Sequence, residues 1–292
     1  MTVLDYRLVD VFTSQPLSGN SLTVFFLNRP LPDALLQAVT REMRHFESIF
    51  LWETPDPHCF RARIFTMEEE LPFAGHPVIG AACALHAERF AGTPEVALRL
   101  QLAERGVPLV SRRGGGHYSA EMEQGTAVFS GSVPREGRDE VLAALNLRPD
   151  DLVSELPLEV VSTGLPYLIV PIRKNLAEAR IVARDFDRLL ARFGASFVYV
   201  IDVPTLEGRT WDNDGRVEDI ATGSAAGPAA AYLVRHGYAR PDLPLVLHQG
   251  RFLGRPSQLI ASVDGEHMSV RVRGDVAPVG GGTLDLRNSP LL

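Results

Sequence analysis

Apolar and polar residues alternate in the first part of the chain in a way that predicts β-strands. In residues 3–11, Leu4, Tyr6 and Leu8 alternate with Asp5 and Arg7, and residues 59–66 repeat the alternation. Since successive side chains of a strand point to opposite faces, a two-residue period indicates strands with one buried face. Short apolar runs predict further strands at 22–27, 48–53, 167–172 and 197–201.

A helical period follows the first two strands. Leu36, Val39 and Met43 recur on one face of residues 33–45, which predicts an amphipathic helix. Two other helices are rich in alanine, and each follows a loop of small residues. Further helices are thus predicted at 138–146, at 185–193, from a loop at 71–77 to about Phe90, and from a loop at 218–225 to near Gly237.

The order of the predicted elements repeats along the chain. In each half, a strand leads into a glycine-containing loop and then into a small-residue helix, which we interpret as a pseudo-repeat of roughly 130 to 140 residues. Gly125, Gly131 and Pro134 interrupt the pattern and place a domain boundary near 125–135. The sequence therefore predicts two domains. Two glycine runs are expected in hairpins or loops, Gly114–Gly116 and Gly280–Gly282.

The loops that precede the two alanine-rich helices are candidate anion sites. Gly75 lies in the loop at 71–77 and Gly223 in the loop at 218–225, each at a predicted helix start. The first turn of a helix has unpaired N–H groups and the positive end of the macrodipole, and a glycine there lets a ligand approach the backbone. Two such loops suggest two halves that close on one small anionic substrate.

Composition and charge place the chain among soluble globular proteins. Of its 292 residues, 45% are hydrophobic and 22% are charged, and the net charge of −7 argues against a nucleic-acid partner. No apolar run is long enough to span a membrane, and the first residues lack the basic region and apolar core of a signal peptide. We therefore expect a cytoplasmic protein without a membrane partner.

The residue types that bind metals and nucleotides form no known motif here. Cys59 and Cys83 are too few for a disulfide scaffold or a cysteine-rich zinc site, and Cys83 lies on an apolar helix stripe that is typical of core packing. The run Glu68–Glu70 is typical of a solvated loop. The sequence contains neither a metal-binding spacing nor a nucleotide-binding glycine motif, so we expect no metal and no cofactor.

Glu47 is the first candidate for proton transfer. It is a lone carboxylate among apolar neighbours, where a predicted helix gives way to a strand. A carboxylate in an apolar pocket has a raised pKa and can act as a general acid or base near neutral pH. The alternative is an exposed glutamate at a strand end, which is the common position of this residue type.

Three polar residues of the two loops are further candidates. His76 lies near a helix start, where it could donate to an anion or transfer a proton, or simply cap the helix. Asp219 could orient a proton-transfer group or bind a substrate amine. Ser224 could donate to a carboxylate from its helix start, or act as an ordinary N-cap. Because Gly223 directly precedes Ser224, the loop is not a nucleophile elbow.

The motifs around these residues resemble those of the phenazine-biosynthesis PhzF-like isomerase family, which has the diaminopimelate-epimerase-like fold. The resemblance covers essentially the whole chain, with several separate motifs in the family's order. The motifs are Asp10–Thr13, Leu17–Asn20, Arg41–Met43 leading to Glu47, Phe73–Pro77, Ser162–Pro166, Glu218–Ala225, Gln249–Gly250 and Gly254–Ser257.

The resemblance implies an α/β (α+β) fold of two pseudo-symmetric halves, each a curled sheet around a central helix, with the active site between them. The first half would be residues 1–130 joined by the extreme C-terminus, and the second half residues 131–292. It also implies a homodimeric isomerase that needs no cofactor.

The family's type reaction is the isomerisation of trans-2,3-dihydro-3-hydroxyanthranilate, a small carboxylated ring. A glutamate removes a proton from carbon and returns it elsewhere on the ring system, and by motif that glutamate is Glu47. The other residues implied by motif position are His76, Asp219 and Ser224, with carboxylate-binding backbone N–H groups near Gly75 and Gly223.

The chain departs from the family pattern at three positions, Phe46, Ile220 and Ser21, and from related epimerases at two more. The family often has serine before the catalytic glutamate, whereas this chain has Phe46, so we expect poor turnover of the type substrate and a preference for a more apolar acid. Related epimerases use two thiols, whose positions by motif are Ala74 and Thr222. Neither residue can act as a base, which argues against a two-thiol mechanism and leaves Thr222, like Phe46, as a substrate-binding position.

Two other functions remain open from the sequence. The first is an epimerase, racemase or lyase that uses Glu47 and His76 as opposed acid and base on another amino or hydroxy acid. The second is a non-catalytic protein that binds small acids, which would be favoured by loss of Glu47 or Asp219. Both residues are present, so this reading ranks last.

Overall fold

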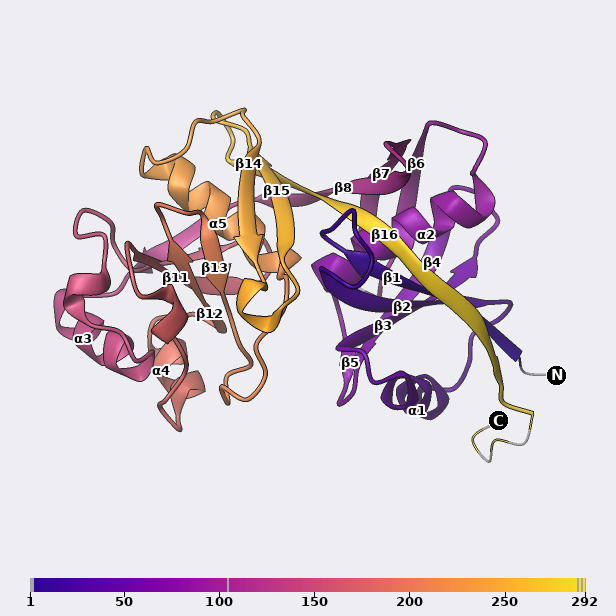
Figure 1. The fold of residues 1–292 in the computed structure, drawn as a ribbon, viewed down its shortest axis with the longest axis horizontal. Helices are drawn as coiled ribbons and strands as arrows, with labels where there is room; N and C mark the ends of the chain where they lie inside the picture. Colours follow the sequence, from indigo (N-terminus) through magenta and orange to yellow (C-terminus); the bar gives the residue numbers. More distant parts are fainter. Residues whose placement is uncertain (1–2, 104, 288, 290, 292) are drawn as a thin grey trace. The chain divides into compact units, whose positions relative to one another are not determined.

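The computed structural model describes residues 3–103, 105–287, 289 and 291. The chain forms two compact units, one of Met1–Glu123 with Arg273–Leu292 and one of Gln124–Val272 (Figure 1). It crosses from one unit to the other in two strands, β8 (His117–Thr126) and β16 (Ser269–Asp285). The C-terminal strand therefore returns to the N-terminal unit.

The sheet of the first unit closes on itself. Its strand order is β1-β2-β3-β4-β6-β7-β8-β16, and β16 also pairs with β1 in antiparallel register. The short strand β5 pairs with β4. The other strands of this unit are β1 (Val3–Val11), β2 (Asn20–Leu27), β3 (Glu47–Glu53), β4 (Cys59–Thr66), β5 (Glu70–Leu71), β6 (Glu95–Gln101) and β7 (Gly106–Gly114).

Helix α2 (Gly75–Arg89) lies inside this closed sheet. Its first twelve residues, Gly75–His86, are all buried, and the helix packs against β1, β2, β3, β6 and β7. A helix surrounded by apolar side chains needs no polar face, which explains its small residues. Gly80 marks the closest approach, because a Cβ there would lie 2.5 Å from Cδ2 of Leu22.

Helix α1 (Asp33–Met43) covers the outer face of the same sheet. It is amphipathic and buries Leu35, Leu36 and Val39 against Phe25 and the other aromatic residues of a second core. Residues on opposite faces of β2 and β3 therefore belong to different layers. The inner layer contacts α2, and the outer layer contacts α1.

The second unit repeats this plan with a different outer layer. Its strand order is β16-β15-β14-β13-β12-β11-β10-β9, and the buried helix α5 (Gly223–Arg235) packs against β10, β11, β12 and β15. Helices α3 (Arg135–Ala144) and α4 (Phe186–Arg192) share a separate hydrophobic core with three of the strands. The strands are β9 (Val128–Ser132), β10 (Glu159–Ser162), β11 (Pro166–Ile172), β12 (Phe197–Asp202), β13 (Glu207–Arg209), β14 (Leu245–Gln249) and β15 (Ser257–Val263), with 3-10 turns at Pro149–Asp151, Leu176–Glu178 and Arg251–Leu253.

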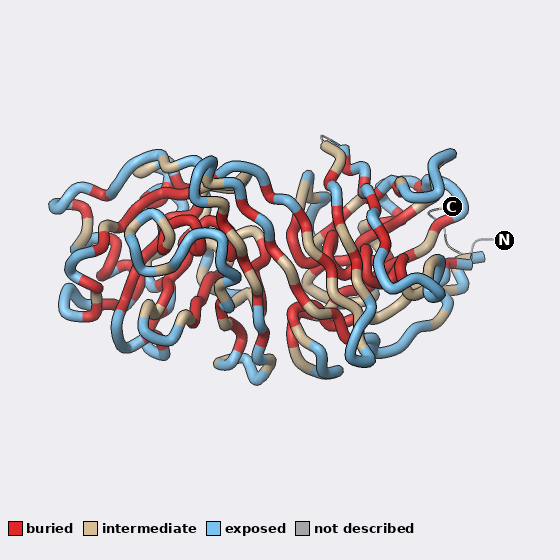
Figure 2. The backbone as a smooth tube through the Cα atoms, turned by 90° about the horizontal axis from the view of Figure 1, so that it is seen from above, coloured by how far each residue is buried: buried red, intermediate tan, exposed pale blue. Residues whose placement is uncertain are grey.

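The predicted fold class is confirmed, and so are the elements with clear periods. Strands β1 and β4 occupy the predicted residues, and all five predicted helices exist within a few residues of their expected ends. Each unit has an apolar interior beneath exposed turns (Figure 2). Among the residues described, no helix is both long and apolar enough to cross a membrane.

The expectation for Gly280–Gly282 is wrong. These residues lie within β16 and pair with Leu8, Arg7 and Tyr6 of β1. A Cβ at Gly282 would lie 2.9 Å from the Tyr6 hydroxyl, and one at Gly281 would lie 2.9 Å from Cδ of Arg7. At Gly281 and Gly282 the neighbouring strand occupies the space that a Cβ would take, whereas a Cβ at Gly280 would meet no atom within 4 Å, so the run is explained by pairing with β1 and not by a turn.

Candidate active site

Glu47 is the first residue of β3, and the sheet aims it at the central helix. The preceding helix α1 ends at Arg44, whose left-handed backbone (φ 56°) reverses the chain into the strand. The Glu47 side chain is 7% exposed, and its Oε2 lies 3.3 Å from Nδ1 of His76. The predicted buried carboxylate is therefore observed, and the alternative of an exposed glutamate is wrong.

His76 is the second residue of α2, and burial keeps it uncharged. Its side chain is 5% exposed, and this burial lowers the pKa of the imidazole from 6.5 to about 3. At neutral pH the contact with Glu47 is consequently not an ion pair. Nε2 of His76 is buried and has no hydrogen-bond partner among the described residues.

Asn20 completes this cluster in the first unit. Nδ2 of Asn20 lies 3.4 Å from Nδ1 of His76. Asp10 shapes the loop before Asn20, because its carboxylate accepts from the Leu17 N–H at 2.7 Å and from the Ser21 hydroxyl at 3.1 Å. Gly19 is required in the same loop, since it has a φ of 64° and a Cβ there would lie 2.4 Å from the carbonyl oxygen of Val11.

The start of α2 has the features that the sequence predicts for an anion site. Ala74 is the N-cap in extended conformation, and no side chain of the described residues caps the helix. The first turn contains no acidic residue. The N–H of Gly75, in the first turn of α2, has no acceptor within the helix and lies beside His76 in the chain. On the strand side of the site, the half-buried Phe46 directly precedes Glu47.

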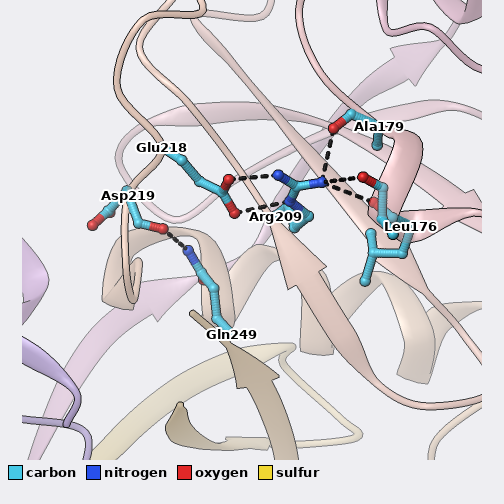
Figure 3. Close-up of polar contacts among 7 residues, drawn as sticks. Leu176, Ala179, Arg209, Glu218, Asp219 and Gln249 are labelled. Carbon is cyan, nitrogen blue, oxygen red and sulfur yellow. Dashed lines mark hydrogen bonds and ion pairs between the residues drawn. The ribbon is translucent and has the colours of Figure 1, made fainter. Parts of the chain in front are cut away.

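A second cluster surrounds Asp219 in the other unit (Figure 3). The Thr222 hydroxyl donates to Oδ2 of Asp219 at 2.5 Å. The Gln249 amide nitrogen donates to the carbonyl oxygen of Asp219 at 2.8 Å and to Oγ1 of Thr222 at 2.9 Å. Thr222 is the N-cap of α5, but its hydroxyl bonds Asp219, and no described side chain caps this helix.

An ion pair anchors the residue before Asp219. Nε and Nη2 of Arg209 bind both carboxylate oxygens of Glu218, at 2.8 and 2.5 Å. Nη1 of the same arginine donates to the carbonyl oxygens of Leu176, Ala177 and Ala179 (Figure 3). The side chains of Arg209 and Glu218 are 10% and 8% exposed, so the pair fixes the loop from within the unit.

Ser224 follows Gly223 at the start of α5. Its hydroxyl lies 2.7 Å from the hydroxyl of Tyr167, a residue of β11. The hydroxyl is therefore held by a neighbouring strand and does not act as an N-cap, which is the role of Thr222 by position. The predicted site residues thus form two groups, one in each unit.

Sequence reasoning did not assign a role to three residues of these groups. Asn20 and Gln249 fall in motifs of the resemblance, but nothing in their periodicity indicates that their amides contact His76 and Asp219. Tyr167 reads only as a strand residue, since its pairing with Ser224 joins positions far apart in the sequence. The motif positions of Asn20 and Gln249 were the available signal.

Solved structures that share this fold include proteins named as epimerases. A protein of Pseudomonas aeruginosa named a predicted epimerase has a TM-score of 0.90 and 50% identity, covering 96% of this chain and 98% of its own. A hydroxyproline epimerase of Agrobacterium vitis shares the fold, with a TM-score of 0.67, 15% identity, and coverage of 100% of this chain and 94% of its own.

The sequence comparisons identify the family. The model of phenazine biosynthesis-like proteins (PhzC-PhzF) matches residues 9–282, so the chain belongs to this family. A trans-2,3-dihydro-3-hydroxyanthranilate isomerase of Pseudomonas fluorescens is 34% identical, covering 97% of this chain and 99% of its own. An uncharacterized isomerase of Mesorhizobium japonicum is 31% identical with the same coverage, 97% and 99%. The chain is an enzyme of the isomerase class.

Proposed function

We propose that this enzyme is a cofactor-independent isomerase that moves a proton on a small, carboxylated cyclic substrate, in the manner of trans-2,3-dihydro-3-hydroxyanthranilate isomerase. The observation that carries the proposal is the buried Glu47 carboxylate in contact with a neutral His76. The relative of that name, similar over almost the whole chain, supports the substrate class.

Glu47 is the proposed acid and base. As a base it takes a proton from a substrate carbon, and as the resulting acid it returns the proton to a different carbon. Because its side chain is 7% exposed, bulk water has little access to the proton that it carries. A positioned general base contributes on the order of 10² to 10⁴ in rate.

His76 is proposed to bind the substrate as a neutral donor. In the state in which Glu47 carries the proton, Nδ1 of His76 accepts from Oε2 of Glu47 at 3.3 Å, and the proton of the neutral ring then lies on Nε2. This buried N–H has no partner among the described residues. A hydroxyl, amine or carboxylate of the substrate would satisfy it, and an unsatisfied buried donor costs roughly 1–3 kcal/mol.

The remaining roles concern the loops. We assign the substrate carboxylate to backbone N–H groups near Gly75 and Gly223, because helix starts without a capping side chain attract anions. The Ser224 hydroxyl would add a donor, and Asp219 would orient a polar group of the substrate. A homodimer in the cytoplasm is also proposed on the family resemblance, and sedimentation of the purified protein tests the dimer.

Epimerisation is the second candidate function. It is favoured by one observation, the name of the Pseudomonas aeruginosa protein that shares 50% of its sequence with this chain. A lowered pKa makes His76 a weak base, however, so an epimerase with Glu47 and His76 as opposed acid and base is harder to reconcile with the site.

One labelling experiment separates the two functions. The enzyme is incubated with trans-2,3-dihydro-3-hydroxyanthranilate in D₂O, and the product is examined by NMR. Isomerisation removes hydrogen from one carbon and adds hydrogen or deuterium at another. Epimerisation instead places deuterium at the carbon that lost hydrogen, with inverted configuration. Recovery of unchanged substrate would contradict the proposed substrate.

A further inference from the structure

Gln249 links the end of one strand to the loop that contains Asp219. It is the last residue of β14, is 1% exposed, and its side chain points toward Asp219 (Figure 3). Its amide makes three hydrogen bonds with this loop. Nε2 donates to the Asp219 carbonyl and to Thr222 Oγ1, and Oε1 accepts from the Thr222 N–H at 3.2 Å.

These bonds impose a direction on the Thr222 hydroxyl. An amide nitrogen is a donor, so Oγ1 of Thr222 must accept from Gln249. The single proton of the hydroxyl is then left for Oδ2 of Asp219, at 2.5 Å. Donation thus runs from Gln249 through Thr222 to the Asp219 carboxylate.

The same amide also selects the N–H groups available to a ligand. The Thr222 N–H is taken by Gln249, and the Thr222 carbonyl accepts from Ala225 and Ala226 in the first turn of α5. The N–H groups of Gly223 and Ser224 lie in the first turn of α5, where backbone N–H groups have no acceptor within the helix. Anion binding at this helix start therefore falls to those two groups.

We propose that Gln249 is a positioning residue for the reaction, acting through Thr222 on the Asp219 carboxylate and on the start of α5. This inference rests on the proposed function, because it gives Asp219 and α5 a place in substrate binding. On the other side of Asp219, the ion pair with Arg209 holds Glu218, the residue that precedes Asp219 in the loop. Gln249 is thus the contact that fixes the orientation of the polar groups themselves.

Two substitutions and one control test the proposal. Gln249→Met keeps the size of the side chain and removes all three hydrogen bonds, whereas Gln249→Glu keeps the acceptor oxygen and removes both donors. Tyr232→Phe is the control, since it removes one hydrogen bond of a buried residue in the same helix, away from its start, the donation of the Tyr232 hydroxyl to the Pro157 carbonyl at 2.6 Å. Thr222→Val removes the intermediate hydroxyl.

The kinetic expectation is a coupled loss. We expect kcat/KM to fall at least about tenfold in Gln249→Met and in Gln249→Glu, and to stay within about threefold of wild type in Tyr232→Phe. In the Thr222→Val background, Gln249→Met should change kcat/KM by less than about threefold, because the link through which it acts is already absent. Additive losses would indicate general destabilisation and overturn the positioning role.

Amide hydrogen exchange of the substrate-free enzyme tests the same contacts without turnover. The Thr222 amide should exchange faster in Gln249→Met, while the Ala226 amide keeps its protection. Unchanged exchange at Thr222 would overturn the proposal, as would faster exchange with unchanged kcat/KM. If wild-type enzyme fails to convert the test substrate, the proposed function is wrong, and the exchange result still decides whether Gln249 holds the loop.

Discussion

The imidazole of His76 illustrates how burial determines the chemistry of one residue. The ring contacts a carboxylate, which in solvent would favour the charged imidazolium. Complete burial has the larger effect and lowers the pKa to about 3, so the ring stays neutral in the working pH range. A neutral ring has one N–H, so when Nδ1 accepts from the protonated Glu47 the ring can donate to a substrate from Nε2.

The lowered pKa of His76 predicts a pH-dependent stability. Between pH 6.5 and about 3 the unfolded chain binds a proton at His76 and the folded chain does not. Folding stability at this residue is therefore complete above pH 6.5 and is lost as the pH falls, by up to a few kcal/mol at about 1.4 kcal/mol per unit. His76→Asn should lose less stability than wild type between about pH 7 and about pH 4 in urea unfolding. Equal losses would contradict the assignment of a buried neutral ring.

We expect Phe46 to determine which substrate the enzyme prefers. A half-buried aromatic ring directly before Glu47 removes a hydroxyl that the family pattern often has there and adds bulk. A lost hydrogen bond weakens transition-state binding by about 0.5–1.5 kcal/mol, and steric conflict adds to this. Phe46→Ser should therefore convert trans-2,3-dihydro-3-hydroxyanthranilate faster than wild type in parallel kinetic assays. Efficient conversion by wild type with no gain in the variant would remove Phe46 from specificity.

At the scale of elements, several site residues lie at the ends of strands and helices, and the two central helices bury those ends. Glu47 begins β3, His76 lies in the first turn of α2, and Gln249 ends β14. Each helix begins inside a curled sheet, so its first-turn groups are shielded from solvent. Small residues are needed along these helices because the surrounding strands lie close to the helix axis.

Gly80 provides a test of this packing. A Cβ there would lie 2.5 Å from Cδ2 of Leu22 and 2.9 Å from Cγ2 of Val11, both fully buried. Overpacking of this kind costs about 1–3 kcal/mol, which exceeds the roughly 1 kcal/mol that alanine gains over glycine in helices. Gly80→Ala should thus lower the free energy of unfolding, whereas Gly92→Ala, with no atom within 4 Å, should leave it nearly unchanged. A Gly80 variant as stable as the control would contradict the packing.

The sequence predicts elements with a local hydrophobic period better than features that depend on residues far away in the sequence. The alternation of Leu4, Tyr6 and Leu8 with Asp5 and Arg7 predicts β1 because it is local, although of these three apolar residues only Leu4 is buried. Gly280–Gly282 gives no strand signal, because glycines carry no apolar alternation and their partner strand β1 lies far away in the sequence. The amides of Asn20 and Gln249 are missed for the same reason, because their partners become neighbours only in the fold.

At the scale of the molecule, the two units place different residues at equivalent positions. Ala74 and Thr222 are the N-caps of the two central helices, where the resemblance places the thiols of two-thiol epimerases. The first unit instead presents Glu47 and His76, and the second presents Asp219 and Ser224.

The proposed binding of the carboxylate by helix starts predicts a dependence on substrate charge. Esterifying the substrate carboxylate removes charge-assisted hydrogen bonds that are worth roughly 1.5–3 kcal/mol each. The methyl ester should therefore bind at least about tenfold more weakly than the acid in isothermal titration with Glu47→Gln enzyme. Equal affinities of acid and ester would contradict carboxylate recognition.

The central claim, proton transfer by Glu47, is tested most directly by comparing two glutamates of one strand. Glu47→Gln preserves the shape of the side chain and removes the base, whereas Glu53→Gln alters an exposed residue at the other end of β3 that pairs with Arg89 at 3.0 Å. We expect kcat for trans-2,3-dihydro-3-hydroxyanthranilate to fall on the order of 10² to 10⁴ in Glu47→Gln and to stay near wild type in Glu53→Gln. A folded Glu47→Gln enzyme with near-wild-type kcat would contradict the account.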